Sequence, residues 1–390
     1  MTVFKPQISY LYTVHNSVML VRGGVQYFTA MKEIIRQAQC SVHLQTYIYE
    51  EDETGEEIAV ELINASLRGV MVYLLLDGYA SRELSDSFLR RLTDSGIHFR
   101  FFEPILKGKS FYFGRRLHHK VLVVDAQIAL VGGVNISNKY NDLPGAPAWL
   151  DWAIRVEGEA AVDLFRICVG IWVKFPAEVR KIIASEIIPA IDKSKHCPVR
   201  VRRNDWVTRK NEISRSYLEM FRNAKDEIII MSSYFLPGRI IRRDMSRAAK
   251  RGVVVKLILA GTSDVKVAKQ AERYMYRWLF KNGIEIYEYP HNILHGKIAV
   301  YDSVWVTSGS YNVNNISAYA SIELNLDVKC HSFAGLVKET LVDIITKDCI
   351  QFTESTYQTK YNFFQRAIQF ASYELVRLVF FLFTFYFRQR

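Results

Sequence analysis

Two segments of the chain carry the hydrophobic pattern of strands that are buried on both faces. Residues 70–76 and 253–259 are near-continuous apolar runs. Residues 56–67 and 240–249, which precede them, have apolar positions at helical spacing, and a glycine follows each two or three residues later. Each apolar run is therefore predicted to be a strand that follows a helix.

Further β-rich runs precede both helical segments, at 42–49 and 227–231. Each half of the chain then has the order strand, helix, strand, helix, strand, strand. Such alternation is typical of an α/β fold in which helices cover a central sheet. The pattern predicts an α/β/α sandwich in each half.

The two halves are copies of one unit, because segments of the first recur in the second in the same order. Residues 65–78 match residues 248–261 without a gap, and 95–97 is echoed by 282–284. The identical positions of the longer match are Arg68, Gly69, Val70, Val72, Leu74 and Gly78, which recur as Arg251, Gly252, Val253, Val255, Leu257 and Gly261. The repeat predicts two tandem domains.

A change in composition separates the two copies. The stretch 176–203 contains Pro189, Pro198 and many lysines and arginines, which is typical of a linker. The expected organisation is a first domain at 1–175, a linker at 176–203, a second domain at 204–360 and a C-terminal segment at 361–390.

Composition adds an expectation about the partner. The 390 residues are 49% hydrophobic and 23% charged, as in a folded globular protein, and the net charge is +11. A basic chain favours an anionic partner, and both nucleic acid and acidic membrane lipid fit. The cysteines are odd in number and scattered, which favours a reducing compartment and argues against disulfides or a zinc site.

The C-terminal segment mixes aromatic rings with arginines. Its uninterrupted apolar part, 378–387, is too short to span a bilayer, and the N-terminus lacks the pattern of a signal peptide. A helix of this composition suits the lipid interface. The alternative is a helix that caps the core of the second domain.

The third match between the halves carries the candidate chemistry. The first copy reads His118-His119-Lys120, then Asp125, then Gly132-Gly133-Val134-Asn135. The second reads His295-Gly296-Lys297, then Asp302, then Gly309-Ser310-Tyr311-Asn312. The offset between the copies is the same at every shared position. Two complete copies make both histidines candidates for catalysis.

Residue types and spacing indicate attack on a phosphodiester. Residues i and i+2 of a strand point to the same face, so each histidine is expected beside its lysine. One imidazole would attack phosphorus to form a phosphohistidine, and the other would act as general acid and base. The lysines, Asn135, Ser310 and Asn312 would neutralise the phosphoryl oxygens, so neither metal nor cofactor is expected.

Four carboxylates complete the candidate site. Asp125 and Asp302 belong to the repeated catalytic motif, although their position beyond a turn favours a role in holding the loop. Asp151 and Glu323 follow their motifs at similar distances, in apolar strand-like runs where a carboxylate needs a partner. They are expected to orient the histidines.

These residues resemble those of the phospholipase D superfamily over nearly the whole chain. Several segments resemble bacterial cardiolipin synthases, above all the form without N-terminal membrane helices. These segments are 75–79, 117–120, 132–135, 234–238, 287–289, 309–312 and 323–325. The resemblance implies two domains related by a pseudo-two-fold axis, with one active site at their interface.

The resemblance also implies an activity. Two phosphatidylglycerols would be converted to cardiolipin and glycerol by a monomer, with His118 as nucleophile and His295 as acid and base. Such an enzyme would bind anionic phospholipid peripherally, at the cytoplasmic face of the bacterial inner membrane. Gly133 stands where the superfamily pattern has serine, whereas Ser310 keeps it.

Other functions remain open from the sequence. The chain would be a hydrolase if water accepted the phosphoryl group, and a non-catalytic binding protein if the motifs were degenerate. The basic and aromatic stretch 107–116 would suit either lipid headgroups or stacked bases. The many aromatic residues and the C-terminal segment favour lipid, so nucleic acid is not the expected partner.

Overall fold

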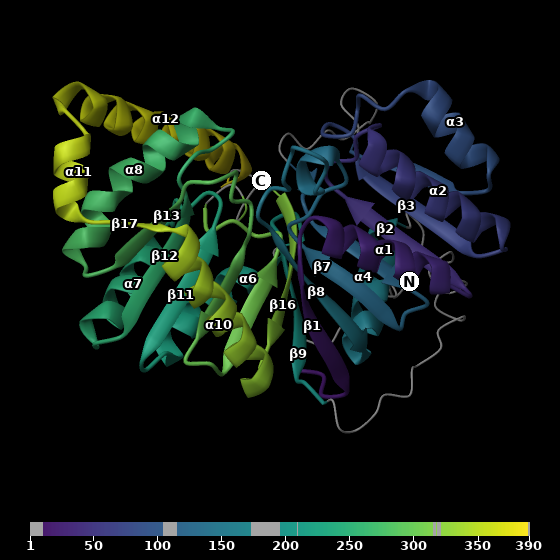
Figure 1. Ribbon diagram of the computed structural model, residues 1–390, viewed down its shortest axis with the longest axis horizontal. Helices are drawn as coiled ribbons and strands as arrows, with labels where there is room; N and C mark the ends of the chain where they lie inside the picture. The colour runs from purple at the N-terminus through teal and green to yellow at the C-terminus, as the bar shows by residue number, and fades with distance from the viewer. Residues whose placement is uncertain are drawn as a thin grey trace. The chain divides into compact units, whose positions relative to one another are not determined.

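The computed structural model describes residues 11–103, 115–172, 196–208, 210–314, 317 and 321–388, and side chains up to residue 381. The chain divides into two compact units (Figure 1). The first comprises Met1–Arg202, Ser308–Ser310 and Leu324–Lys329, and the second comprises Arg203–Thr307, Tyr311–Glu323 and Cys330–Arg390. The predicted linker lies largely outside the described residues, so its boundaries stay a prediction.

The first sheet has the strand order β1-β8-β7-β6-β2-β3-β4. Its strands are β1 (Asn16–Arg22), β2 (Ser41–Thr46), β3 (Met71–Asp77), β4 (His98–Phe102), β6 (Lys120–Val124), β7 (Ile128–Gly132) and β8 (Trp152–Gly158). Strands β2, β3 and β4 are parallel, and β6 joins them antiparallel through β2.

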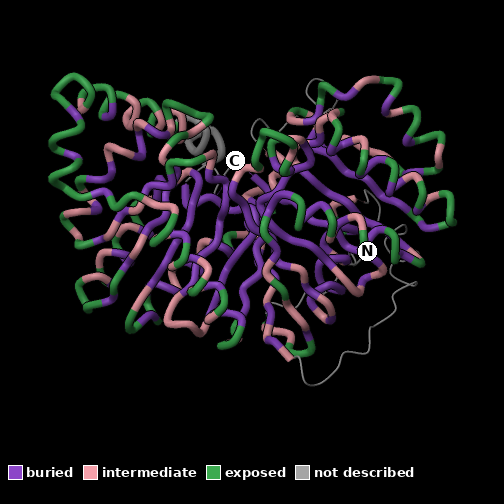
Figure 2. The backbone as a smooth tube through the Cα atoms, viewed as in Figure 1, coloured by how far each residue is buried: buried purple, intermediate pink, exposed green. Residues whose placement is uncertain are grey.

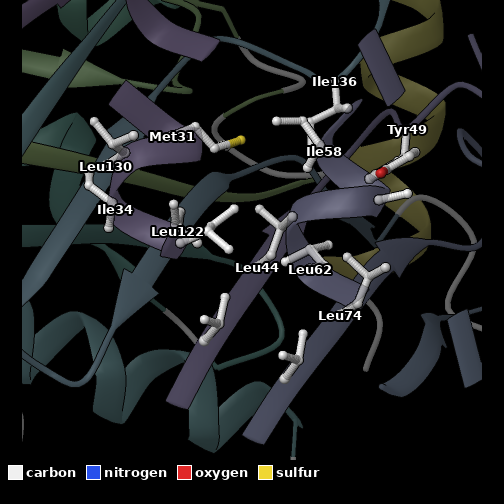
Figure 3. Packing of buried hydrophobic residues seen from close by; sticks show 14 of the residues in the cluster. Met31, Ile34, Leu44, Tyr49, Ile58, Leu62, Leu74, Leu122, Leu130 and Ile136 are labelled. Carbon is white, nitrogen blue, oxygen red and sulfur yellow. The ribbon is translucent and has the colours of Figure 1, made fainter. Parts of the chain in front are cut away.

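Helices cover both faces of this sheet, because successive residues of a strand point to opposite sides. The helices are α1 (Val25–Gln37), α2 (Glu53–Leu67), α3 (Asp86–Asp94) and α4 (Glu159–Trp172). Val42 and Leu44 of β2 join the apolar cluster formed with α1 and α2, part of which is shown in Figure 3. His43, between them, meets Phe165 of α4 instead. The predicted α/β/α layering is confirmed here.

The second sheet runs in the order β10-β9-β16-β15-β14-β11-β12-β13-β17. Its strands are β9 (Val199–Asp205), β10 (Lys210–Asn211), β11 (Glu227–Ser232), β12 (Val254–Ala260), β13 (Glu285–Tyr289), β14 (Ile298–Tyr301), β15 (Trp305–Gly309), β16 (Ser321–Val328) and β17 (Ile350–Phe352). As in the first sheet, three strands are parallel (β11, β12 and β13), and β14 pairs antiparallel with the first of them.

Helices of the second half include two crossovers between the parallel strands, α7 (Arg239–Lys250) and α8 (Lys266–Lys281). The others are α6 (Glu212–Asn223), α10 (His331–Asp348), α11 (Glu354–Lys360) and α12 (Phe363–Arg388). Helix α12 packs along α8. Among the described residues, we find no helix with the length and apolar character that a membrane span requires.

The residues repeated in sequence occupy repeated positions in space. Arg68 donates to carbonyl oxygens at the end of α1, and Arg251 does the same at the end of α6. Gly69 and Gly252 follow the ends of α2 and α7 with φ of 89° and 95°, a left-handed conformation that glycine adopts without a Cβ penalty. The repeat therefore preserves the way each helix returns to the sheet.

Candidate active site

The first motif lies at the edge of the sheet where the parallel strands end. β2 ends at Thr46 and β3 at Asp77, while the antiparallel β6 begins at this edge with Lys120. Lys120 pairs with Gly132, the last residue of β7, and Gly132 pairs with Ala153 of β8. This end of the sheet therefore brings together the motif lysine, the glycine pair at the end of β7 and the residues that precede β8.

His118 lies just before β6, and not within the strand as the sequence pattern predicted. Its ring is 4.9 Å from the ring of Tyr47, and Lys120 places its ammonium 5.2 Å from the same ring. The Lys120 ammonium also donates to the backbone carbonyl of His118, and its side chain is almost fully buried. The expected closeness of histidine and lysine holds, although His118 is not part of the strand.

The second motif repeats this arrangement. Strand β14 begins at Ile298, so both His295 and Lys297 precede it. The Lys297 ammonium donates to the backbone carbonyl of His295 and lies 3.0 Å from Nδ1 of the same residue. A buried cation beside an imidazole stabilises negative charge on a group that the imidazole contacts.

The motif aspartate of the first half anchors a turn. Asp125 and Ala126 have φ of 53° and 54° in the tight turn between β6 and β7. The Asp125 carboxylate accepts backbone N–H groups from Gln39, Cys40 and Ser41 at 2.7–2.8 Å. These bonds tie the turn to the start of β2.

The second half has the same anchor. Asp302 and Ser303 have φ of 48° and 51°, and the Asp302 carboxylate accepts N–H groups from Lys225, Asp226 and Glu227 at 2.7–3.0 Å. A carboxylate with three backbone donors is committed to holding its loop. Both motif aspartates therefore have a structural role at the strand start, as their position beyond the turn indicated.

The two motif asparagines are fixed by their carbonyl oxygens. Asn135 accepts the backbone N–H of Ile48 at 3.2 Å and donates from Nδ2 to the hydroxyl of Tyr140 at 2.8 Å. Asn312 accepts the hydroxyl of Ser233 at 2.7 Å. With the oxygen held in this way, the donor side of each amide has a defined direction.

The first half has Gly133 where the second half has Ser310, and the difference has a steric reason. A Cβ on Gly133 would lie 2.4 Å from Oδ1 of Asp151, which is fully buried and accepts the Trp152 N–H at 2.8 Å. Burial, followed by the charge of Asp151, raises the pKa of Tyr27. The carboxylate thus occupies the space that a serine side chain would need.

Ser310 has the room that Gly133 lacks. Its backbone N–H donates to the carbonyl of Leu324 at 3.0 Å, and its hydroxyl oxygen accepts the Leu324 N–H at 3.1 Å. Glu323, the neighbour of Leu324, is fully buried in β16. The serine therefore joins the second motif to the strand that carries the second candidate orienting carboxylate.

A prediction follows for the first of these two positions. Gly133→Ser should lower the free energy of unfolding by about 2 kcal/mol, because the new side chain collides with the buried Asp151 carboxylate. Urea denaturation measures this. The matched control is Gly335→Ser, where a Cβ meets nothing within 4 Å, so a loss of equal size there would contradict the steric explanation.

Sequence reasoning missed an anchor of the first motif, Asp77. This fully buried carboxylate ends β3 and accepts the backbone N–H of Leu117 at 2.8 Å, next to His118. It also accepts N–H groups from Tyr79 and Ala80 at 3.0 and 3.1 Å. A carboxylate that closes a long apolar run was the available signal.

The second half has alanine at the corresponding position, Ala260, and uses a buried ion network nearby. Lys269 of α8 lies 2.6 Å from Glu272 and 3.2 Å from Glu288 of β13. Burial alone would raise the pKa of Glu288, but the charges of Lys269 and Arg273 lower it. Glu272 accepts the backbone N–H of Phe235 at 3.0 Å, so this network holds the segment that leads into α7.

Two other histidines belong to the scaffold. Burial lowers the pKa of His43 to about 3, so this ring is neutral between Tyr73 and α4. His119, beside the motif histidine, is fully buried, and its Nε2 lies 2.9 Å from the side-chain oxygen of Gln45. Their surroundings separate them from the candidate catalytic pair.

The basic stretch before His118 is described only at its end. Arg116 lies 3.5 Å from Asp77, and Arg115 lies 3.9 Å from Glu103. The remaining predicted contributors, Lys107, Lys109, Phe111, Tyr112 and Phe113, lie outside the described residues. In the part of the chain that the structure describes, no cluster of three or more His, Cys, Asp or Glu side chains has a metal-binding arrangement.

Comparison with solved structures supports the fold. A crystal structure of phosphatidylserine synthase from Haemophilus influenzae Rd KW20 matches with a TM-score of 0.73, covering 95% of this chain and 97% of that one. The sequence identity is 14%, so this likeness concerns the fold alone. It confirms the predicted α/β fold over both halves of the chain.

Sequence comparison adds the family. The profile of the family described as "Cardiolipin synthase, PLD-like domain" matches residues 31–144 and 217–344, which together exceed half of the chain. Cardiolipin synthase B from Salmonella typhi is 37% identical over 352 residues, covering 87% of this chain and 83% of that protein. Cardiolipin synthase B from Escherichia coli K12 is 34% identical, with the same coverage. The chain therefore belongs to the cardiolipin synthase family of the phospholipase D superfamily, and it is a phosphatidyltransferase, as the resemblance in sequence predicted.

Proposed function

We propose that this protein makes cardiolipin from two phosphatidylglycerols through a covalent phosphatidyl-histidine. The observation that carries the proposal is the second copy of the histidine and lysine pair, with the same local geometry, in a chain of this family. A single imidazole cannot serve as the nucleophile and as the acid and base in the same step. Two supply a nucleophile and a separate acid and base.

In the first step, His118 attacks the phosphorus of one phosphatidylglycerol. A bond forms between the imidazole and phosphorus, the bond to the glycerol headgroup breaks, and His295 gives its proton to the departing glycerol. In the second step, His295 takes the proton from a headgroup hydroxyl of the second phosphatidylglycerol. That oxygen displaces the histidine from phosphorus, which gives cardiolipin and restores both imidazoles.

Other candidate residues act on charge and orientation. Lys120 and Lys297 stabilise the phosphoryl oxygens, with Asn135, Ser310 and Asn312 as neutral donors. Asp151 and Glu323 are proposed to fix the tautomers of the two histidines. The mechanism requires that both motifs reach one phosphate.

The partner and the setting follow from this activity. The substrates are phospholipids, and we infer that the anionic phosphatidylglycerol is preferred because the chain carries a charge of +11. The protein is proposed to act as a monomer, peripherally, at the cytoplasmic face of the bacterial inner membrane. Nucleic acid has no part in this function.

A product assay tests the proposal. Purified protein incubated with phosphatidylglycerol vesicles should release glycerol and cardiolipin in equal amounts, measured by enzymatic glycerol assay and lipid chromatography. Phosphatidic acid as the sole lipid product would assign a hydrolase instead. Addition of EDTA should leave the rate unchanged, since the proposed chemistry uses side chains only; complete loss would overturn the metal-free mechanism.

A further inference from the structure

Helix α12 is attached to the second half by one face. Gln369 is fully buried and accepts a hydrogen bond from the hydroxyl of Tyr357, and the ring of Tyr373 lies 4.8 Å from the ring of Tyr274 of α8. Tyr373 and Val376 also pack against a small apolar cluster of Leu236, Ala271 and Met275. Through this inner face α12 packs on the second half, as expected for a helix that caps a core. This was one of the two alternatives predicted for the C-terminal segment.

The opposite face of α12 is apolar and exposed. Phe364, Ile368, Ala371, Leu375 and Leu378 follow one another at spacings of four, three, four and three residues, so they form one stripe along the helix. The exposed fractions of the four large side chains are 75%, 56%, 51% and 53%. Figure 2 colours much of the described part of this helix as exposed. Phe363 and Phe381 are also more than half exposed, on a neighbouring face of the helix.

Up to residue 381, the charged side chains of α12 lie beside this stripe, not within it. Arg377 pairs with Glu374 at 2.7 Å, and Arg366 donates to backbone carbonyl oxygens of Tyr361 and Gln358. A helix that faced water on this side would carry charged residues at the stripe positions. The stripe therefore has the composition of a contact surface.

The neighbouring helices are strongly basic. α8 carries Lys266, Arg277 and Lys281 as exposed cations, and a single acid, Glu272, which is buried. α7 lies next to α8, because Arg242 stacks over Trp278 at 5.9 Å. The sequence of α7 adds five basic residues against one acidic residue. Exposed cations thus flank the apolar stripe within this layer of helices.

We propose that the outer face of α12 is the surface with which the second half docks on an anionic bilayer. The inference rests on the proposed function, because the substrate of that function resides in a bilayer. An apolar stripe beside exposed cations is complementary to acyl chains below negatively charged headgroups. A second copy of the chain is a poorer occupant, since a symmetric contact would bring basic helices together.

Docking at this face also bears on the second motif. Leu236, which packs against α12, donates its backbone N–H to Val313 at 3.0 Å. Val313 follows Asn312 directly. The helix that contacts the membrane therefore rests on the segment that supports a proposed phosphate-binding residue, and docking orients that residue relative to the lipid surface.

Vesicle binding of a triple variant tests the proposal. Ile368→Gln, Leu375→Gln and Leu378→Gln together should reduce binding to vesicles of equal phosphatidylglycerol and phosphatidylcholine by about tenfold or more, measured by flotation. The matched control is Val60→Gln, Leu67→Gln and Leu336→Gln, three apolar residues on other helices with exposed fractions of 49%, 72% and 50%. The control should bind like the parent, and both variants should keep the parent's melting temperature.

Further measurements separate the possible outcomes. Arg277→Glu with Lys281→Glu should weaken binding to anionic vesicles and leave binding to pure phosphatidylcholine unchanged, which tests the cationic flank if the triple variant does not fold. Equal binding of parent and triple variant would overturn the proposal. If the parent forms a dimer, and the triple variant is monomeric but still binds vesicles, the face would be assigned to contact with a second copy of the chain. Absence of cardiolipin synthesis in the parent, with docking as expected, would refute the proposed function alone.

Discussion

Replacement of His118 or His295 by alanine should lower the rate of cardiolipin formation by at least about 10³-fold. Each imidazole has a role in both steps that water or a neighbouring side chain does not replace. The measurement is the initial rate of glycerol release from phosphatidylglycerol vesicles. His98→Ala and His331→Ala, which alter exposed histidines in the two halves, should keep the parent's rate.

A substrate with an activated leaving group distinguishes the two roles. A phosphatidyl ester of p-nitrophenol needs no acid, so His295→Ala should release about one equivalent of nitrophenol in a burst and retain a phosphatidyl group on the protein. His118→Ala should show no burst. The opposite pattern would exchange the roles of the two histidines, and substantial cardiolipin synthesis by either variant would refute the two-histidine mechanism.

Replacement of the motif aspartates, unlike that of the histidines, should affect stability more than the rate. Asp125→Ala and Asp302→Ala should each lower the free energy of unfolding by about 3 kcal/mol, because three backbone N–H groups lose a charged acceptor and the turn loses a residue suited to positive φ. Urea denaturation at neutral pH measures the effect. The rate per folded molecule should fall by less than tenfold.

Asparagine variants provide a graded control for this prediction. Asp125→Asn and Asp302→Asn keep an acceptor oxygen and tolerate the left-handed turn, so their loss of stability should be smaller than that of the alanine variants. Unchanged stability with a 10³-fold fall in rate would move these aspartates from the scaffold to the chemistry.

Features that depend on hydrophobic periodicity or on the internal repeat could be predicted from the sequence. Continuous apolar runs predicted β3 and β12, and helical spacing predicted α2 and α7, because strands and helices buried in an α/β sheet need those periods. The repeat identified Arg68 and Arg251 as equivalent before their shared contact with a helix end was known. It also singled out the two histidine and lysine pairs.

Other features depend on approach in space and left little trace in the sequence. Asp77 was missed because its counterpart is Ala260, so the repeat gave it no weight. The prediction that His118 lies within a strand was wrong, because an apolar run does not show at which residue strand pairing begins. Lys269 and Glu288 lie on separate elements, and no local pattern connects them.

The close approach of Asp151 to Gly133 has a consequence for the equivalence of the two halves. The first half has no side chain at Gly133, beside the Asp151 carboxylate, whereas the second half carries the Ser310 hydroxyl, so the two halves are not interchangeable. A chain assembled from two first halves would lack the Ser310 hydroxyl altogether.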